Sequence, residues 1–133
     1  MLELKDFEEA KKRVDEVIIP TPLIYSPAFS KECRNMVYIK PENLQRTGAF
    51  KIRGAYNKIM KMDDESKSRG LIASSAGNHA QGVAYAAQQL GVKATIVMPA
   101  HTPLIKVDAT KALGADVVLH GEVYDDAYNK AVE

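Results

Sequence analysis

The sequence has few of the residues that build disulfides and metal sites. It contains one cysteine, Cys33, and three histidines. A single cysteine excludes an internal disulfide framework and a cysteine-based zinc cluster, which fits a reducing compartment. His101 and His120 have no second His, Cys or carboxylate at ligand spacing. We therefore predict no metal site.

Long apolar runs and an excess of one charge are also missing. No segment approaches the roughly 20 apolar residues of a membrane span, and the mixed-charge start, Met1 to Lys12, does not resemble a signal peptide. Lys and Arg total 18 against 17 Asp and Glu, so the net charge of +1 gives no electrostatic reason to expect nucleic acid or an anionic membrane as partner. We expect a soluble, cytoplasmic protein.

The remaining composition is that of an ordinary globular domain, with 46% hydrophobic and 26% charged residues. From Gly70 onward, short apolar runs alternate with longer segments of helical periodicity. The pattern predicts strands over 71–74, 94–98 and 116–119, and helices over 78–90, 104–113 and from about 123. This alternation indicates the α/β class, with a parallel sheet and flanking helices.

The first half of the chain is less regular. A possible capping box from Asp6 to Glu9 predicts a short amphipathic helix that ends before Pro20. The further expectations are an extended connector over 18–23, a strand over 36–40, a loop over 41–49, a helix over 50–62 and a surface turn over 63–69.

One polar cluster lies where the first regular strand leads into a helix, at Ser74 to Gly82. Its small residues leave backbone N–H groups free to hold a carboxylate or another anion, and the Asn78 side chain is expected at the mouth of the turn. Serine, glycine and asparagine are also ordinary capping and turn residues. His79, Gln81 and the serines together, however, have more polar capacity than one helix cap uses.

A second cluster, Gln45 to Ala55, places Lys51 in the first turn of a helix. The helix dipole and the nearby Arg46 and Arg53 favour a neutral amine, and a lysine with a lowered pKa is what Schiff-base chemistry requires. A solvated basic helix face explains the same residues without chemistry. The two clusters act together only if both face one cleft.

The ordered set of motifs covers nearly the whole chain. Its members are Thr21-Pro22-Leu23, Lys40-Pro41-Glu42-Asn43-Leu44-Gln45, Thr47-Gly48-Ala49-Phe50-Lys51-Ile52-Arg53-Gly54-Ala55, Ser74-Ser75-Ala76-Gly77-Asn78-His79-Ala80-Gln81-Gly82, Val97-Met98-Pro99 and Gly114-Ala115-Asp116-Val117. With these motifs the sequence resembles the fold-type II pyridoxal-phosphate enzymes, in particular threonine dehydratases and the related serine racemases and serine dehydratases. The resemblance implies that residues 47–133 form a small, tryptophan synthase β-like domain, and that residues 1–46 belong to a larger one.

The resemblance also implies a site for pyridoxal 5′-phosphate. Lys51 would form a Schiff base with the cofactor and later move the α-proton, Phe50 would lie beside the pyridine ring, and Asn78 would bind the cofactor's 3′-hydroxyl. The substrate carboxylate would be bound by Ser75, Ala76, Gly77, Asn78 and His79. The implied reaction converts L-threonine or L-serine, as a small amino-acid substrate, to a 2-oxo acid and ammonia. A homo-oligomer is expected.

Two positions depart from the family pattern. Ala49 stands where the family usually has a serine, and Ala76 stands where the racemases have one. Because alanine cannot transfer a proton, Ala76 favours elimination over racemisation. A serine racemase, a β-replacing synthase of the same fold and a non-catalytic fragment remain alternatives, whereas the absence of Gly-x-Gly-x-x-Gly and Walker sequences disfavours a nucleotide-binding domain.

The last segment, Tyr124 to Glu133, reads as a helix without a stop residue. The glycine-rich loop that cradles the cofactor phosphate in the family has no counterpart before Glu133. We therefore expect a truncated chain, and we expect that the isolated 133 residues bind the cofactor poorly and are inactive.

Overall fold

A three-stranded parallel sheet organises the second half of the chain. The computed structural model describes residues 1–133 and orders the strands β3–β4–β5. β3 spans Leu71–Ser74, β4 spans Ala94–Met98 and β5 spans Asp116–Leu119. In the register, Ile72 lies opposite Thr95, and Ile96 lies opposite Val117. These strands have the bounds that the sequence predicts, and the parallel α/β class is confirmed.

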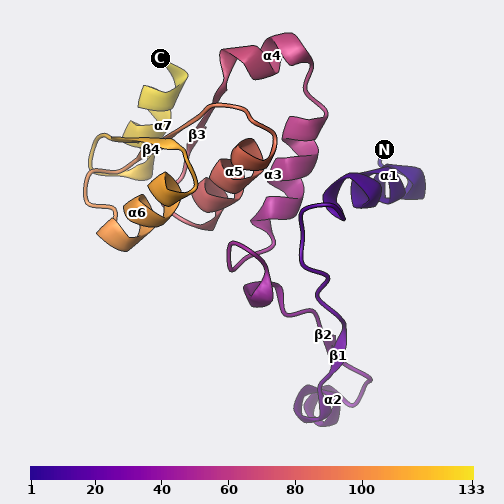
Figure 1. The fold of residues 1–133 in the computed structure, drawn as a ribbon. Helices are drawn as coiled ribbons and strands as arrows, with labels where there is room; N and C mark the ends of the chain where they lie inside the picture. Colours follow the sequence, from indigo (N-terminus) through magenta and orange to yellow (C-terminus); the bar gives the residue numbers. More distant parts are fainter.

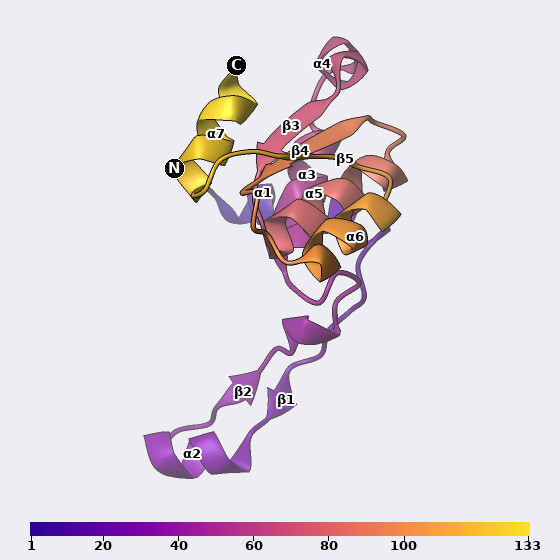
Figure 2. The same cartoon turned by 90° about the vertical axis from the view of Figure 1, so that its left-hand side faces the viewer.

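Helices cover both faces of this sheet. α5 (Asn78–Gln89) connects β3 to β4, and α6 (Leu104–Ala112) connects β4 to β5. Figure 2 shows these two helices on one side of the sheet and α7 (Tyr124–Val132) on the other. Gly91 and Gly114 follow α5 and α6 with φ angles of +64° and +82°, a conformation in which glycine readily ends a helix. Because both faces are covered, β4 is almost entirely buried.

The first half of the chain adds two more helices to the core. α3 (Lys51–Met60) packs against α5, and α1 (Leu4–Val14) lies against α3 (Figure 1). The small alanines of α5 allow the larger side chains of α3 to approach closely. The shared core includes Ile52, Tyr56, Ile59, Ala80, Ala84, Ala87, Ile96 and Met98. Val14, Val17 and Ile18 belong to the same core, and the domain boundary after residue 46 stays a prediction.

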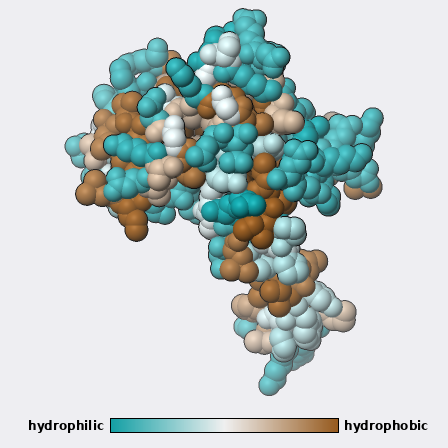
Figure 3. Space-filling model, in the orientation of Figure 1, coloured by the Kyte–Doolittle hydropathy of each residue, from teal (hydrophilic) through white to brown (hydrophobic).

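An arm formed by residues 24–39 projects from this body (Figures 1 and 2). It consists of β1 (Ile24–Tyr25), α2 (Pro27–Cys33) and β2 (Tyr38–Ile39), and the two strands pair antiparallel. The rings of Tyr25 and Tyr38 meet edge to face, with 5.5 Å between their centres. A two-stranded ribbon is only marginally stable by itself. Figure 3 shows hydrophobic side chains along the arm, whose exposed residues include Ile24, Tyr25, Phe29, Met36, Tyr38 and Ile39.

Several local expectations need correction. α1 begins at Leu4 rather than Asp6, because the Asp6 carboxylate caps the backbone N–H of Glu3. The predicted surface turn over 63–69 contains helix α4 (Asp64–Arg69), whose first turn is capped by the Asp63 side chain.

The region around the arm also differs from the expected pattern. The predicted strand over 36–40 shrinks to Tyr38–Ile39, because its partner β1 is only two residues long and α2 begins at Pro27, soon after β1 ends. The loop before α3 contains a short 3₁₀ helix, η1 (Glu42–Leu44), which the sequence did not predict.

No helix of the chain combines the length and the hydrophobicity needed to cross a membrane.

Candidate functional site

Lys51 lies in the first turn of α3, as the sequence predicts; the helix begins at Lys51 itself, and the Lys51 side chain is exposed. The Lys51 Nζ atom lies 5.4 Å from the centre of the Phe50 ring, and the Phe50 side chain is itself 58% exposed. An amine at this distance from an aromatic face is within the range of a cation–π contact. Ala49 is buried, so alanine fits where a serine would bring a hydroxyl that needs a partner. The amine and one aromatic ring therefore share an open surface.

The bend after β3 lies in residues 75–77, with Asn78 as the first residue of α5. The Ser75 Oγ atom accepts hydrogen bonds from the backbone N–H groups of Gly77 at 3.3 Å and Ala80 at 3.2 Å. The first N–H groups of α5, those of Asn78 and His79, have no acceptor within the helix. The Asn78 side chain is exposed and also makes no hydrogen bond to the protein. The bend therefore keeps hydrogen-bonding groups free at a helix N-terminus, where an anion is favoured.

A close backbone contact brings the two clusters together. At Gly82, a Cβ atom would lie only 3.1 Å from the backbone N of Ile52 and the backbone C of Lys51, and 3.3 Å from the Lys51 Cβ. Gly82 lies one helical turn after Asn78, so both occupy the same face of α5. The start of α3 thus packs on the face of α5 that carries Asn78, and the absence of a side chain at Gly82 allows it.

The environment of His79 supports this proximity. The residue remains exposed, yet neighbouring atoms that displace water from its ring lower the pKa of the imidazole, and the Lys51 charge lowers that pKa further. The charge of Lys51 therefore reaches the bend that the sequence pattern predicts to hold an anion. Lys51, Phe50, Asn78 and His79 lie in one region, with Ser75, Ala76 and Gly77 between the end of β3 and α5.

Two hydroxyl groups beside these clusters have no partner. The Oγ1 atom of Thr47 and the Oγ atom of Ser74 are buried and make no hydrogen bond. Buried polar atoms are nearly always paired, so each unpaired atom calls for a physical explanation. Thr47 stands shortly before Lys51 in the sequence, and Ser74 stands at the same spacing before Asn78. The loop before α3 and the last residue of β3 therefore carry hydrogen-bonding capacity that the chain itself leaves unused.

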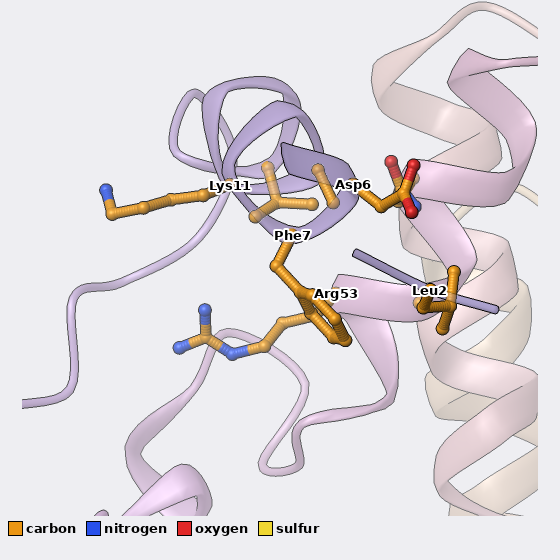
Figure 4. A pocket seen from close by; sticks show the side chains of 9 residues that line it. Leu2, Asp6, Phe7, Lys11 and Arg53 are labelled. Atoms are coloured by element: carbon orange, nitrogen blue, oxygen red, sulfur yellow. The ribbon is translucent and has the colours of Figure 1, made fainter. Parts of the chain in front are cut away.

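The hollows of the surface do not coincide with Lys51. A hollow of about 510 Å³ lies between α1 and α3, where Leu2, Phe7 and Arg53 line it (Figure 4). A second, of about 420 Å³, lies between α3, α5 and β3 and reaches His79. Neither is lined by Lys51 or Asn78. The chain contains no group of three or more His, Cys, Asp or Glu side chains that could hold a metal ion.

An ion pair beside Lys51, between Arg53 and Glu42, is not predicted from the sequence. Arg53 donates to both carboxylate oxygens of Glu42, from Nε at 3.0 Å and from a terminal nitrogen at 2.8 Å. The hydrogen bonds from Arg53 hold the pKa of Glu42 at about 2, against burial that would raise it, and Thr21 and Lys40 lower it as well. The sequence shows opposite charges at Glu42 and Arg53 in neighbouring motifs. Whether the two side chains pair depends on how the loop between η1 and α3 folds, which the sequence does not reveal.

Comparison with known proteins places these features in a wider group. A family model described as pyridoxal-phosphate dependent enzyme matches residues 14–133. The chain is 51% identical over 132 residues to the L-threonine ammonia-lyase of Thermotoga maritima, covering 99% of this chain and 33% of that protein.

Solved structures agree with this similarity. Threonine deaminase isoform 2 of Solanum lycopersicum matches 98% of this chain and 38% of its own with a TM-score of 0.85 and 42% identity. Maize serine racemase matches 98% of this chain and 40% of its own with a TM-score of 0.90 and 33% identity. The chain thus spans only about a third of the length of the curated relatives that it matches, 33% in the example from Thermotoga maritima.

Proposed function

The chain belongs to the family of pyridoxal-phosphate dependent enzymes, and on this basis we propose that the full-length protein is a lyase that converts L-threonine, and also L-serine, to a 2-oxo acid and ammonia. The observation that carries the proposal is the contact of the Lys51 backbone with Gly82, which joins the amine to the face of α5 that bears Asn78. A fold-level likeness alone would not specify a reaction. Here the family's reactive amine and its polar bend occur together.

The residues present fit the aldehyde and ring end of pyridoxal phosphate. An amine beside an exposed aromatic ring, a free side-chain amide at Asn78 and unpaired hydroxyls on Thr47 and Ser74 offer suitable contacts. When bound, this cofactor supplies an electron sink next to the carbon that loses its proton. Lys51 would hold the cofactor, Phe50 would lie beside its ring, and Asn78 would bind its 3′-hydroxyl.

The remaining residues of the bend would orient the substrate. The backbone N–H groups at the start of α5 and the polar residues Ser75 and His79 would bind its carboxylate, together with Ala76, Gly77 and Asn78. With the carboxylate fixed there, and once the substrate's own amino group had displaced Lys51, the freed Lys51 Nζ atom would take the α-proton. Loss of the β-hydroxyl as water then leads to an enamine, which water converts to the 2-oxo acid and ammonia.

Racemisation of serine is the second candidate, because maize serine racemase is among the structural neighbours. A racemase needs a second proton-transferring group on the opposite face of the substrate. In this chain the bend carries Ala76, whose methyl group can neither donate nor accept a proton. Elimination therefore remains the better proposal.

We also propose that the protein works in the cytoplasm, since Cys33 is free and exposed.

The assignment of Lys51 is tested by substitution in the full-length protein. Lys51→Ala should lower kcat for L-threonine by at least about a hundredfold, the usual contribution of a positioned acid or base. The rates at which the 2-oxo acid and ammonia are released are to be measured. Lys58→Ala is the matched control, because it removes an exposed lysine from the same helix. If Lys51→Ala retains the activity of Lys58→Ala, the assignment of Lys51 is wrong.

A further inference from the structure

The loop before Lys51, residues 41–50, is tied to residues 17–19, which follow α1, by the side chains of Gln45 and Arg46. The Gln45 side chain both accepts from the backbone N–H of Ile19 at 2.8 Å and donates to the Ile19 carbonyl at 2.9 Å. Gln45 is only 4% exposed. Arg46 Nε donates to the carbonyl of Val17 at 2.8 Å. The middle of the loop is therefore held against a segment that belongs to the hydrophobic core.

The ion pair of Glu42 and Arg53 joins the two ends of the same loop. Glu42 lies at the loop's start in η1, whereas Arg53 lies in the first turn of α3, two residues after Lys51. The Thr21 hydroxyl donates to the Glu42 Oε1 atom at 2.6 Å and closes the network. The side chains of Glu42 and Arg53 are 17% and 27% exposed, so water competes little for their hydrogen bonds.

The Lys51 side chain has no comparable anchor of its own. It is exposed, and its only specific neighbour is the ring of Phe50, which is itself largely exposed. The loop also contains Gly48, whose φ angle is +66°. No atom of the protein lies within 4 Å of the place where a Cβ of residue 48 would be, so neighbouring groups do not hold the loop there. The direction in which the amine leaves the backbone must therefore be set by how the loop and the first turn of α3 are held.

We propose that Glu42 and Arg53 are positioning residues for Lys51, and that their bidentate pairing fixes the loop over residues 41–50 so that the amine points to the bend before α5. The inference rests on the proposed function, because it concerns the same lysine. Neither residue touches the reacting atoms. Their effect is exerted through the backbone of the loop and of the first turn of α3.

The test uses the full-length protein loaded with pyridoxal phosphate. The rate at which hydroxylamine removes the cofactor reports how firmly the Lys51 attachment is held, independently of turnover. Glu42→Gln should raise this rate about tenfold and lower kcat about tenfold, with KM for L-threonine changed less, because a small misplacement costs rate more than binding. Circular dichroism before the measurement establishes that the variant is folded.

Two controls separate positioning from general loosening. Glu65→Gln makes the same chemical change in the exposed ion pair with Arg69. Asn57 lies on the same helix as Arg53, and Asn57→Ala removes the hydrogen bond that the Asn57 side chain accepts from Arg13 of α1. Both should change the cofactor-removal rate by less than about twofold, since neither touches the loop before Lys51.

Exchanging the two charges of the ion pair is the decisive experiment. Glu42→Arg and Arg53→Glu should each raise the removal rate, and the double variant should restore at least part of the loss. If Glu42→Gln behaves like Glu65→Gln, or if the double variant is worse than the sum of its single variants, the positioning role is wrong. If the unsubstituted protein holds no cofactor that borohydride can fix to Lys51, the proposed function fails, and the positioning role fails with it.

Discussion

At the scale of single residues, Gly82 decides how near Lys51 can come to the bend. A Cβ at this position would lie 3.1 Å from two backbone atoms of α3, which cannot move as a flexible side chain would. The contact explains why a glycine stands inside a helix, where it costs roughly 1 kcal/mol of helix stability relative to alanine. The helix gives up that stability for the close approach of the segment that carries the amine.

Gly82→Ala should therefore separate stability from activity. The gain in helix propensity opposes the strain at α3, so the free energy of unfolding should change by no more than about 1 kcal/mol. The displaced Lys51 backbone should lower kcat by about tenfold or more. Thermal unfolding and steady-state kinetics of the full-length protein measure the two effects.

Gly54 offers a matched control for this substitution. It lies in α3, and a Cβ there would meet no atom within 4 Å. Gly54→Ala should stabilise the protein by about 0.5–1 kcal/mol and leave kcat unchanged. Equal kinetic effects of the two alanine substitutions would show that the contact at Gly82 does not set the position of Lys51.

At the scale of elements, the link between η1 and α3 predicts a specific sensitivity to acid. The pKa of Glu42 lies at about 2 in the folded chain, against an ordinary value of 4.5, because Arg53 stabilises the carboxylate. A lowered pKa means that the unfolded state binds the proton first as the pH falls. The stabilisation is fully present above pH 4.5 and is lost as the pH falls toward 2.

The expected loss between pH 5 and pH 3 is roughly 2 kcal/mol of local opening free energy in the loop and the first turn of α3. Hydrogen exchange of peptides from residues 41–56, corrected for intrinsic rates, measures it. Glu42→Gln should lack this acid-dependent part, whereas Glu65→Gln should keep it. An identical pH dependence in Glu42→Gln and the unsubstituted protein would contradict the role of Arg53 as its counter-charge.

The sequence predicts the elements well where the signal is local. The strands β3, β4 and β5 are short apolar runs between glycines and prolines, and their bounds are as expected. The arm is different, because β1 and β2 are two residues each and exist only through pairing across α2. Helix α4 was missed because six polar residues show no apolar face, although Asp63 was a readable cap.

The site was predictable to the same extent and for the same reason. Lys51 and the bend at Asn78 stand in continuous motifs, so their residues could be named before their positions were known. The pairing of Glu42 with Arg53 and of Gln45 with Ile19 joins segments 11 and 26 residues apart, so no local pattern reveals it. The roles given to Lys51, Phe50, Asn78 and the rest of the bend stay predictions.

At the scale of the whole molecule, the chain leaves much apolar surface open to solvent. The arm exposes Ile24, Phe29 and Met36, each at half or more of its surface. Surfaces of this kind on a protruding ribbon commonly mark contacts with further protein. We expect the full-length protein to be a homo-oligomer, with a mass by light scattering that is a multiple of one polypeptide. A single-polypeptide mass across micromolar concentrations would contradict this expectation.

We expect Lys51 to carry the cofactor at the place where α3 meets the bend before α5. The most direct test is to reduce the loaded full-length protein with borohydride, digest it and map the modified lysine by mass spectrometry. The peptide that contains Lys51, and no other peptide, should carry the added mass of the reduced cofactor. Attachment to a different lysine, with Lys51 unmodified, would contradict it.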